Sequence, residues 1–403
     1  MNAINWDVQK LYLDTATMGR MSPSACAATN DLNRLASSAG CSPKIGRLVT
    51  EGFGSLSCRD QELFQSLACW RGMASFQSKL KKLVSLEQCL PVYLFSDPSF
   101  RLRLALECLL KNCKRILITD LLWTKYEERI REAENEGVKI VTCCLRPSLE
   151  GTAGGADLIR KQIVSMFQQN RCDGMLISHV THMGCVMPVS EIVSQVREFK
   201  DGAFVVIDGA QALGHVPVDV RQLDCDLYLT CTQKWLGSYI PLRVVYGCRL
   251  ETVDLVRSTI QQMVRHEQGD ALNEFCSLAA KGCYKRFGEA ISLASLFAAC
   301  GAIYDYDNQF ESSEQKLLIL GDNGKKVRSV LQEKYAPMYR FGDEMKCGIL
   351  SVKGGKNTKL LMERLVTNGI SAKNFAENIR LSMPSQPISH DQIRLIEDAM
   401  LVD

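Results

Sequence analysis

The middle of the chain alternates short runs of consecutive apolar residues with longer segments in which apolar positions recur at helical spacing. Short apolar runs suit strands that are buried on both faces of a sheet. The runs span residues 92–96, 115–119, 138–143, 174–178, 203–208, 226–230 and 242–247, and the helical segments include 122–136, 156–169 and 190–200. This alternation predicts an α/β fold with a seven-stranded, mostly parallel sheet and helices on both faces.

The alternation ends after residue 255. Helical spacing then dominates over 288–304 and 317–335, and a short β-α-β pattern follows at 347–352, 356–368 and 379–382. We therefore expect a large domain over residues 25–255 and a smaller α+β domain formed by 1–24 and 256–403. The longest apolar stretch, 291–303, is too short to span a bilayer and predicts a buried helix.

Composition narrows the class of protein. The 403 residues include 46% hydrophobic residues, enough for a large core, and the net charge is +3 from 48 basic and 45 acidic residues. This balance gives no attraction toward nucleic acid or an anionic membrane, so we expect neither as a partner. The 18 cysteines accompany no secretory signal and do not form the two closely spaced pairs of a structural zinc site. We interpret most of them as small core residues in a reducing, cytoplasmic compartment, and we expect no metal.

Two reactive side chains follow neighbouring predicted strands. Asp208 ends one strand, and Lys234 lies just past the end of the next. Parallel strands end at one edge of a sheet, where ligands bind, so both side chains should project over that edge. Alone, such an Asp is usually a helix cap and such a Lys is usually solvated.

Together these residues meet the needs of pyridoxal phosphate (PLP). The aldehyde of PLP requires a lysine amine to form a Schiff base, which we assign to Lys234. Its ring nitrogen stays protonated beside a buried carboxylate, which we assign to Asp208. Gln211 is placed to hydrogen-bond the ring hydroxyl, and the small residues Gly209 and Ala210 let the ring approach the backbone.

The segment from Asp208 to Leu236 resembles the cofactor-binding core of the class V aminotransferase family of fold type I PLP enzymes. That family includes cysteine desulfurases, isopenicillin N epimerase, kynureninase and C–S lyases. Shorter stretches at residues 12–16, 94–100, 178–184, 348–351 and 379–382 resemble other parts of the family pattern. The resemblance implies a fold type I architecture and an active site at the interface of a homodimer.

The resemblance also implies roles by position. Ser99, at a helix start, would hold the cofactor phosphate, with further contacts from Thr232 and Gln233. Trp123 lies near the position of an aromatic residue over the cofactor ring, although it fits a core or interface anchor equally well.

Two further roles concern the ring hydroxyl and the substrate. Thr181 or His182 would touch the ring hydroxyl or the substrate. Arg380 would clamp the α-carboxylate of the substrate, and its alternative is a surface salt bridge.

The chain departs from the family pattern at three places. Residues 371–378 contain no cysteine, and the nearest one, Cys347, begins a predicted strand, which disfavours a desulfurase that passes sulfur on as a persulfide. Residues 239–241 replace a glycine turn after the lysine. The Gly-Thr pair that reaches the phosphate of a neighbouring subunit is absent, and Gly288-Glu289 is nearest to it.

The expected function is therefore a PLP-dependent reaction at Cα or Cβ of an amino acid or cysteine conjugate. We favour lyase-type β-elimination, as in C–S lyases. An aminotransferase, an epimerase or a decarboxylating enzyme starts from the same chemistry, since freed Lys234 can act as the base at Cα. A PLP-fold scaffold that has lost catalysis is the alternative outside the enzymes.

Overall fold

The structure of the chain is a computed structural model. It describes residues 10–40, 43–97, 99–124, 126–135, 137–151, 155–266, 269–283, 285, 290–331, 334–340 and 342–400, without the side chains of 127–129 and 133. The pair Gly288-Glu289 lies outside the described residues.

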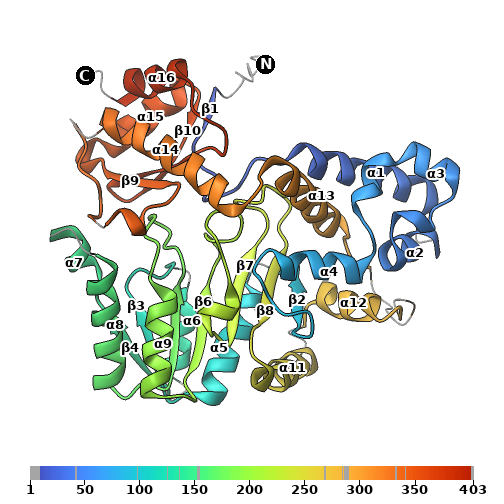
Figure 1. The fold of residues 1–403 in the computed structure, drawn as a ribbon, viewed down its shortest axis with the longest axis horizontal. Coiled ribbons are helices and arrows are strands. Elements are labelled where there is room, and N and C mark those ends of the chain that lie inside the picture. Colours follow the sequence, from blue (N-terminus) through green and yellow to red (C-terminus); the bar gives the residue numbers. More distant parts are fainter. Residues whose placement is uncertain are drawn as a thin grey trace.

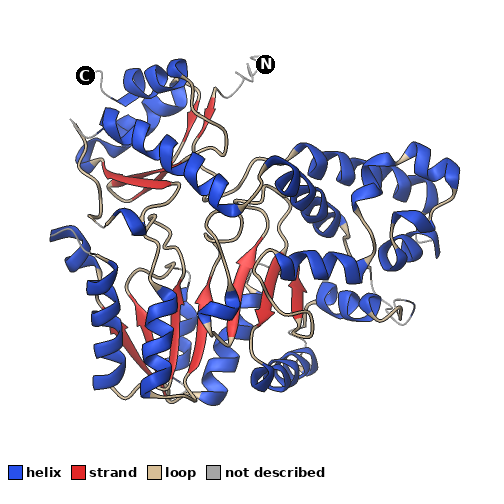
Figure 2. Ribbon diagram, viewed as in Figure 1, coloured by secondary structure: helices blue, strands red, loops and turns tan. Residues whose placement is uncertain are grey.

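A seven-stranded sheet forms the centre of the molecule (Figures 1 and 2). Its strand order is β2-β8-β7-β6-β5-β3-β4. The strands are β2 (Val92–Phe95), β3 (Arg115–Thr119), β4 (Lys139–Cys143), β5 (Gly174–Ser178), β6 (Phe204–Asp208), β7 (Leu227–Cys231) and β8 (Arg243–Gly247). β8 runs antiparallel to both of its neighbours, β2 and β7, and the other strand pairs of this sheet are parallel. The predicted seven-stranded, mostly parallel sheet is confirmed, and its strand ends shift by one residue at most.

Helices cover both faces of this sheet because its strands are apolar on both sides. Met175 and Ile177 pack into one core with helices α8 (Ala156–Gln169) and α9 (Val189–Phe199). Leu176, between them, packs into a second core on the opposite face. That core includes residues from α5 (Phe100–Asn112), α6 (Tyr126–Asn135) and α11 (Leu250–Arg265). Alternate residues along a strand point to opposite faces, which explains the two cores.

The predicted buried helix over 291–303 is α13 (Ala294–Gln309), whose residues 295–303 are all buried. It packs against α1 (Pro23–Ala39), beside a group of short helices. Those helices are α2 (Pro43–Glu51), α3 (Cys58–Leu63) and α4 (Met73–Lys82). Three further short helices are α7 (Arg146–Gly151), α10 (Val220–Leu223) and α12 (Ala271–Ala280).

A second, three-stranded sheet lies above the edge of the large sheet (Figure 1). Its order is β11-β12-β9, and β1 pairs separately with β10. The strands are β1 (Leu11–Tyr12), β9 (Ile349–Lys353), β10 (Ile370–Ser371), β11 (Lys373–Phe375) and β12 (Asn378–Ser382), with helices α14 (Ser313–Leu331), α15 (Thr358–Thr367) and α16 (His390–Met400). The N-terminal segment thus joins the C-terminal part, whereas α11 packs on α5 and β8. The boundary at residue 256 stays a prediction.

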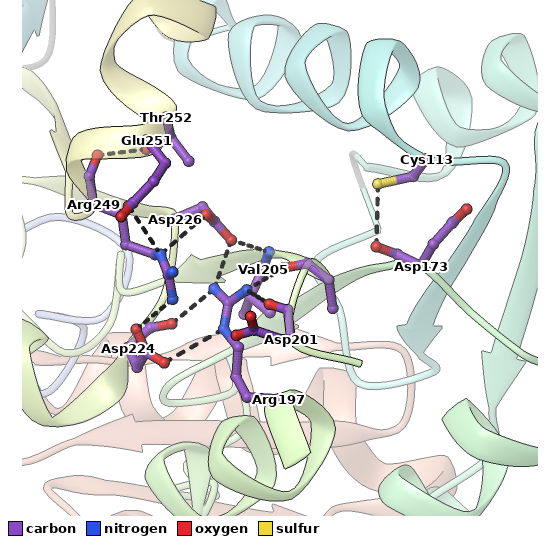
Figure 3. A network of polar contacts seen from close by, with 11 residues as sticks. Cys113, Asp173, Arg197, Asp201, Val205, Asp224, Asp226, Arg249, Glu251 and Thr252 are labelled. Atoms are coloured by element: carbon purple, nitrogen blue, oxygen red, sulfur yellow. Dashed lines mark hydrogen bonds and ion pairs between the residues drawn. The ribbon is translucent and has the colours of Figure 1, made fainter. Parts of the chain in front are cut away.

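A network of ion pairs fixes the edge of the large sheet opposite to Asp208 (Figure 3). Asp226, just before β7, accepts a hydrogen bond from the Val205 amide at 2.6 Å and pairs with Arg197 at 2.9 Å. Arg249 pairs with Asp224 at 2.8 Å. These contacts tie α9, β6, β7 and the start of α11 together, so they stabilise the scaffold away from the candidate site.

None of the described helices combines the length and apolarity needed to cross a bilayer. Every cysteine in the described ranges is free, and no cluster of three or more His, Cys, Asp or Glu side chains there is arranged to hold a metal ion.

Candidate functional site

Asp208 lies at the carboxyl end of β6 and is 6% exposed. The amide of Ala210 donates to its Oδ1 at 2.9 Å, and the hydroxyl of Tyr126 donates to its Oδ2 at 2.5 Å. Burial, followed by the Asp208 charge, raises the pKa of Tyr126 well above its ordinary value, so the hydroxyl remains a donor. The carboxylate is therefore held in one orientation, and Oδ2 keeps a lone pair for a further donor.

Lys234 follows β7, which pairs with β6 in parallel, so its backbone lies at the same edge as Asp208. Burial lowers the pKa of Lys234, and the nearby Arg101 and Arg380 guanidiniums lower it further, against the opposite effects of Cys231 and Asp208. A lowered pKa increases the fraction of neutral amine, which is the form that attacks carbonyl groups and accepts protons.

Close packing fixes the backbone of the lysine loop. The Gly19 amide donates to the carbonyl of Gln233 at 2.7 Å. A Cβ atom at Gly19 would lie 2.0 Å from the carbonyl oxygen of Lys234, so no other residue fits there without displacement. Tyr239, where the family pattern has a glycine turn after the lysine, takes a φ of 58° in the left-handed region, which is uncommon for residues other than glycine.

Gln211 uses its side-chain amide to join this loop to the N-terminal segment. Its Oε1 accepts from the Trp235 indole at 2.9 Å, and its Nε2 donates to the carbonyl of Ala16 at 2.8 Å. The indole of Trp235 stacks on His215 with ring centres 3.6 Å apart. The predicted contact of Gln211 with a ring hydroxyl stays a prediction, and the second N–H of Nε2 and the second lone pair of Oε1 are not used by these two bonds.

Arg380, on β12, is 1% exposed, so the salt bridge that it forms with Asp14 is not at the surface, and its role as a carboxylate clamp stays a prediction. Its Nη1 donates to the carbonyl of His182 at 3.1 Å, and its Nη2 donates to the Thr17 hydroxyl at 2.6 Å. Asp14 lies at 3.4 Å from the same Nη2. Its Nε is buried without a hydrogen-bond partner among the described residues, so the guanidinium has a donor to spare.

Three rings lie together beside Arg380. The Trp123 and His182 ring centres are 5.4 Å apart, and Phe375 lies 5.9 Å and 5.6 Å from them. Arg380 lies over the Phe375 ring at 4.8 Å. Burial and then Arg380 lower the pKa of His182 to about 4, so this imidazole is neutral at physiological pH. Thr181 accepts from the Cys185 amide at 3.0 Å and so closes a local turn.

The loop after β2 satisfies its own hydrogen-bond donors. The amide and the hydroxyl of Ser99 both donate to Asp97 Oδ1 at 2.8 Å. Asp270 accepts from the amides of Ser96 and Asp97 at 2.9 Å each. Chain carboxylates therefore occupy the places where a phosphate would bind to amides, and the predicted role of Ser99 stays a prediction.

The other two predicted phosphate contacts, Thr232 and Gln233, differ in whether their side chains already have hydrogen-bond partners. The Thr232 hydroxyl is engaged with Ser238 at 2.8 Å. Gln233, in contrast, is 4% exposed and its Oε1 has no hydrogen-bond partner among the described residues.

Sequence reasoning missed four residues of this region: Tyr126, Phe375, Arg101 and Arg243. Arg101 lies in the first turn of α5, and Arg243 begins β8. A charged residue at the start of a buried apolar run was the available signal for Arg243. Nothing in the local sequence marks Tyr126, because its partner Asp208 lies 82 residues away.

Comparison with known proteins bears on this geometry. Residues 159–239, which contain Asp208, Gln211 and Lys234, match the family described as Aminotransferase class-V. The resemblance to the class V aminotransferases is confirmed.

A cysteine desulfurase of Serratia proteamaculans is 34% identical over 130 residues, covering 31% of this chain and 29% of that protein. A cysteine desulfurase of Yersinia pseudotuberculosis is 30% identical over 145 residues, covering 34% and 33%. The chain thus matches about a third of the length of these curated relatives.

Solved structures share the fold over nearly the whole chain. The cystine C-S lyase C-DES, in complex with cysteine persulfide, has a TM-score of 0.67 at 15% identity and covers 96% of this chain and 97% of its own. An alanine–glyoxylate aminotransferase from Nostoc has a TM-score of 0.67 at 17% identity and covers 97% and 95%. The architecture is that of fold type I PLP enzymes, as predicted.

Proposed function

We propose that the chain is a PLP-dependent enzyme that acts at Cα or Cβ of an amino acid or cysteine conjugate, by lyase-type β-elimination. One observation carries the proposal. Lys234, with its lowered pKa, and the fixed carboxylate of Asp208 follow neighbouring parallel strands and meet at one edge of the sheet.

The described residues fit PLP. Asp208 Oδ2 keeps acceptor capacity for a protonated ring nitrogen. Two buried polar atoms nearby, Gln233 Oε1 and Arg243 Nε, have no hydrogen-bond partner among the described residues. Buried polar atoms are rarely left unpaired in native proteins, so these atoms support a polar ligand at this edge.

Each residue then has a task. Bound PLP would supply an electron-withdrawing ring that makes the Cα–H bond of an amino acid acidic. Lys234 Nζ would anchor the cofactor and, once released, take the Cα proton, which its lowered pKa favours. Arg380 would bind the α-carboxylate through its fork of N–H donors, while the neutral His182 and Trp123 would wall the site.

The β11–β12 hairpin separates this chain from a persulfide-passing desulfurase. The hairpin pairs Lys373–Phe375 with residues 378–380, and residues 371–378 contain no cysteine. Cys347 is 6% exposed, and burial raises the pKa of its thiol to about 12, so it is a poor nucleophile. The desulfurase relatives support a sulfur-containing amino acid, and β-elimination needs no protein thiol.

Transamination is the second candidate reaction, since the same proton abstraction begins it, and epimerisation or decarboxylation belong to the same chemistry. A scaffold without catalysis is the remaining alternative. We also propose a homodimer in the cytoplasm, and the free cysteines support a reducing compartment.

An absorption spectrum of the purified chain with PLP tests the proposal. A visible band of lysine-bound PLP should form in the wild type and be absent from Lys234→Ala. Lys326→Ala, which removes an exposed lysine of α14, is the matched control and should keep the band. Pyruvate release from cysteine conjugates would then identify the lyase, whereas accumulation of the pyridoxamine form would identify an aminotransferase. Absence of the band in the wild type would refute the enzyme proposal and favour the scaffold.

A further inference from the structure

Arg243 occupies a special place at the edge of the large sheet. It begins β8 and lies between the last residues of two neighbouring strands, Phe95 on one side and Cys231 on the other. Cys231 lies three residues before Lys234, so Arg243 belongs to the same edge as the proposed cofactor site. Its side chain is half-buried, and its Nε is buried with no hydrogen-bond partner among the described residues.

A second guanidinium lies beside it. Arg101, in the first turn of α5, donates from Nη1 to the carbonyl of Thr230 at 3.0 Å. Burial lowers the pKa of Arg243, and Arg101 lowers it further, so the two cations are close enough to repel each other. Burial acts to lower the pKa of Arg101, but Asp208, Tyr126 and Cys231 together outweigh burial and raise that pKa.

Arg243 has no carboxylate of its own among the described residues. The Cys231 thiol and, more weakly, Asp97 act to raise the pKa of Arg243, but Cys231 is not a carboxylate, and Asp97 is committed to Ser99 and, at 2.6 Å, to Arg103. A half-buried cation without an ion-pair partner is unfavourable, and an anion bound at this place would stabilise it.

The loop after β2 cannot supply an anion site through its amides, because Asp97 and Asp270 already accept from them. A phosphate at this edge would be repelled by these carboxylates at the loop and attracted by the guanidiniums at β8 and α5. Guanidinium groups suit phosphate because two parallel N–H donors match two of its oxygens.

We propose that Arg243, with Arg101 beside it, binds a phosphate group within this single chain, in place of the amides of the loop after β2. The inference rests on the proposed function, under which the group is the phosphate of PLP. Arg243 then takes over the task that the loop amides and Ser99 were expected to perform.

Comparison of PLP with pyridoxal, which lacks the phosphate, tests the assignment. Dissociation constants are measured from the visible band for the wild type and Arg243→Gln. The substitution should weaken PLP binding about tenfold to a hundredfold, the range for one charge-assisted hydrogen-bonded contact, and leave pyridoxal binding unchanged. Equal weakening of both ligands would show that Arg243 only maintains the fold, and no weakening of PLP would also overturn the inference.

Two further variants sharpen the result. Arg243→Lys keeps the positive charge but loses the forked pair of N–H donors. Its affinity for PLP should therefore lie between those of Arg243→Gln and the wild type, and its affinity for pyridoxal should equal that of the wild type. Arg257→Gln removes an arginine that is 63% exposed on α11 and should behave as the wild type. Unfolding curves of each variant establish that the chain still folds.

Inorganic phosphate separates a failure of this inference from a failure of the proposed function. Phosphate added to the cofactor-free chain should raise the melting temperature of the wild type but not that of Arg243→Gln. If PLP forms no lysine-dependent band, the proposed function fails, and this phosphate effect alone then supports the anion site. If phosphate stabilises neither protein, or both equally, the anion site is refuted.

Discussion

Lys316, on α14, offers a quantitative test of the buried core between the lysine loop and the C-terminal part. Its side chain is 4% exposed, and its Nζ donates to the carbonyl of Trp235 at 2.7 Å. The rings of Tyr306 and Phe310 lie 5.1 Å and 5.2 Å from the ammonium group. No ion pair of Lys316 occurs among the described residues, so burial alone lowers its pKa to about 7. We predict that Lys316→Met changes the pH dependence of stability.

The sign follows from proton binding. The pKa of Lys316 is about 7 in the folded chain and about 10.4 in the unfolded chain, so the unfolded chain binds more protons between these values. The free energy of unfolding therefore rises with pH across this window, by about 1.4 kcal/mol per pH unit. Below about pH 7 the full penalty of roughly 5 kcal/mol is present, and above the unfolded pKa it disappears. The methionine of Lys316→Met binds no proton, so the variant lacks this pH-dependent contribution to the free energy of unfolding.

Urea unfolding, followed by tryptophan fluorescence between about pH 7.5 and pH 9.5, measures the effect. Over this interval the wild type should gain about 3 kcal/mol relative to Lys316→Met. Loss of the bond to the Trp235 carbonyl adds a constant offset, because a neutral amine also donates. Lys326→Met, an exposed lysine of the same helix, is the control and should follow the wild type. A stability difference between wild type and Lys316→Met that stays constant with pH would refute the reasoning.

Three predictions concern the proposed PLP site. Gly19→Ala should reduce the band of lysine-bound PLP severalfold, because the added carbon would lie 2.0 Å from the Lys234 carbonyl oxygen; an unchanged band contradicts this. Tyr126→Phe removes the hydroxyl that donates to Asp208 and should weaken PLP binding about threefold to tenfold in equilibrium dialysis; unchanged affinity would show that the hydroxyl does not support the carboxylate. Arg380→Gln should raise KM for the amino acid about tenfold to a hundredfold with the band intact; loss of the band as well would indicate a structural role.

Much of the fold follows from short-range pattern. The runs at 174–178 and 203–208 are long enough for strands and are apolar up to their last residues, Ser178 and Asp208, which favours strands in the middle of a sheet covered on both faces. The apolar segment 291–303 predicts a helix that is buried on all sides, which is α13. Asp208 and Lys234 could be placed together because the ends of neighbouring parallel strands share one edge. Predicting this part of the site requires only the positions and the directions of the strands.

The partners of the site residues follow from contacts between distant segments. Gln211 has the spacing of a cofactor ligand, yet its amide joins Trp235 to Ala16, which lies 195 residues away. Ser99 looks like a phosphate ligand from its helix start, but a neighbouring carboxylate already accepts its donors.

The pattern of apolar residues thus predicts the sheet, and the positions of Asp208 and Lys234 after neighbouring strands place both residues at its edge. The hydrogen-bond partners come from the tertiary structure, in which the donors of Ser99 are taken by Asp97 and Arg243 Nε is unpaired among the described residues, and our proposal of a phosphate contact at Arg243 rests on this difference. The physical reason is that strand formation depends on the period of neighbouring residues, whereas hydrogen-bond satisfaction depends on every polar group that folding brings within about 3 Å.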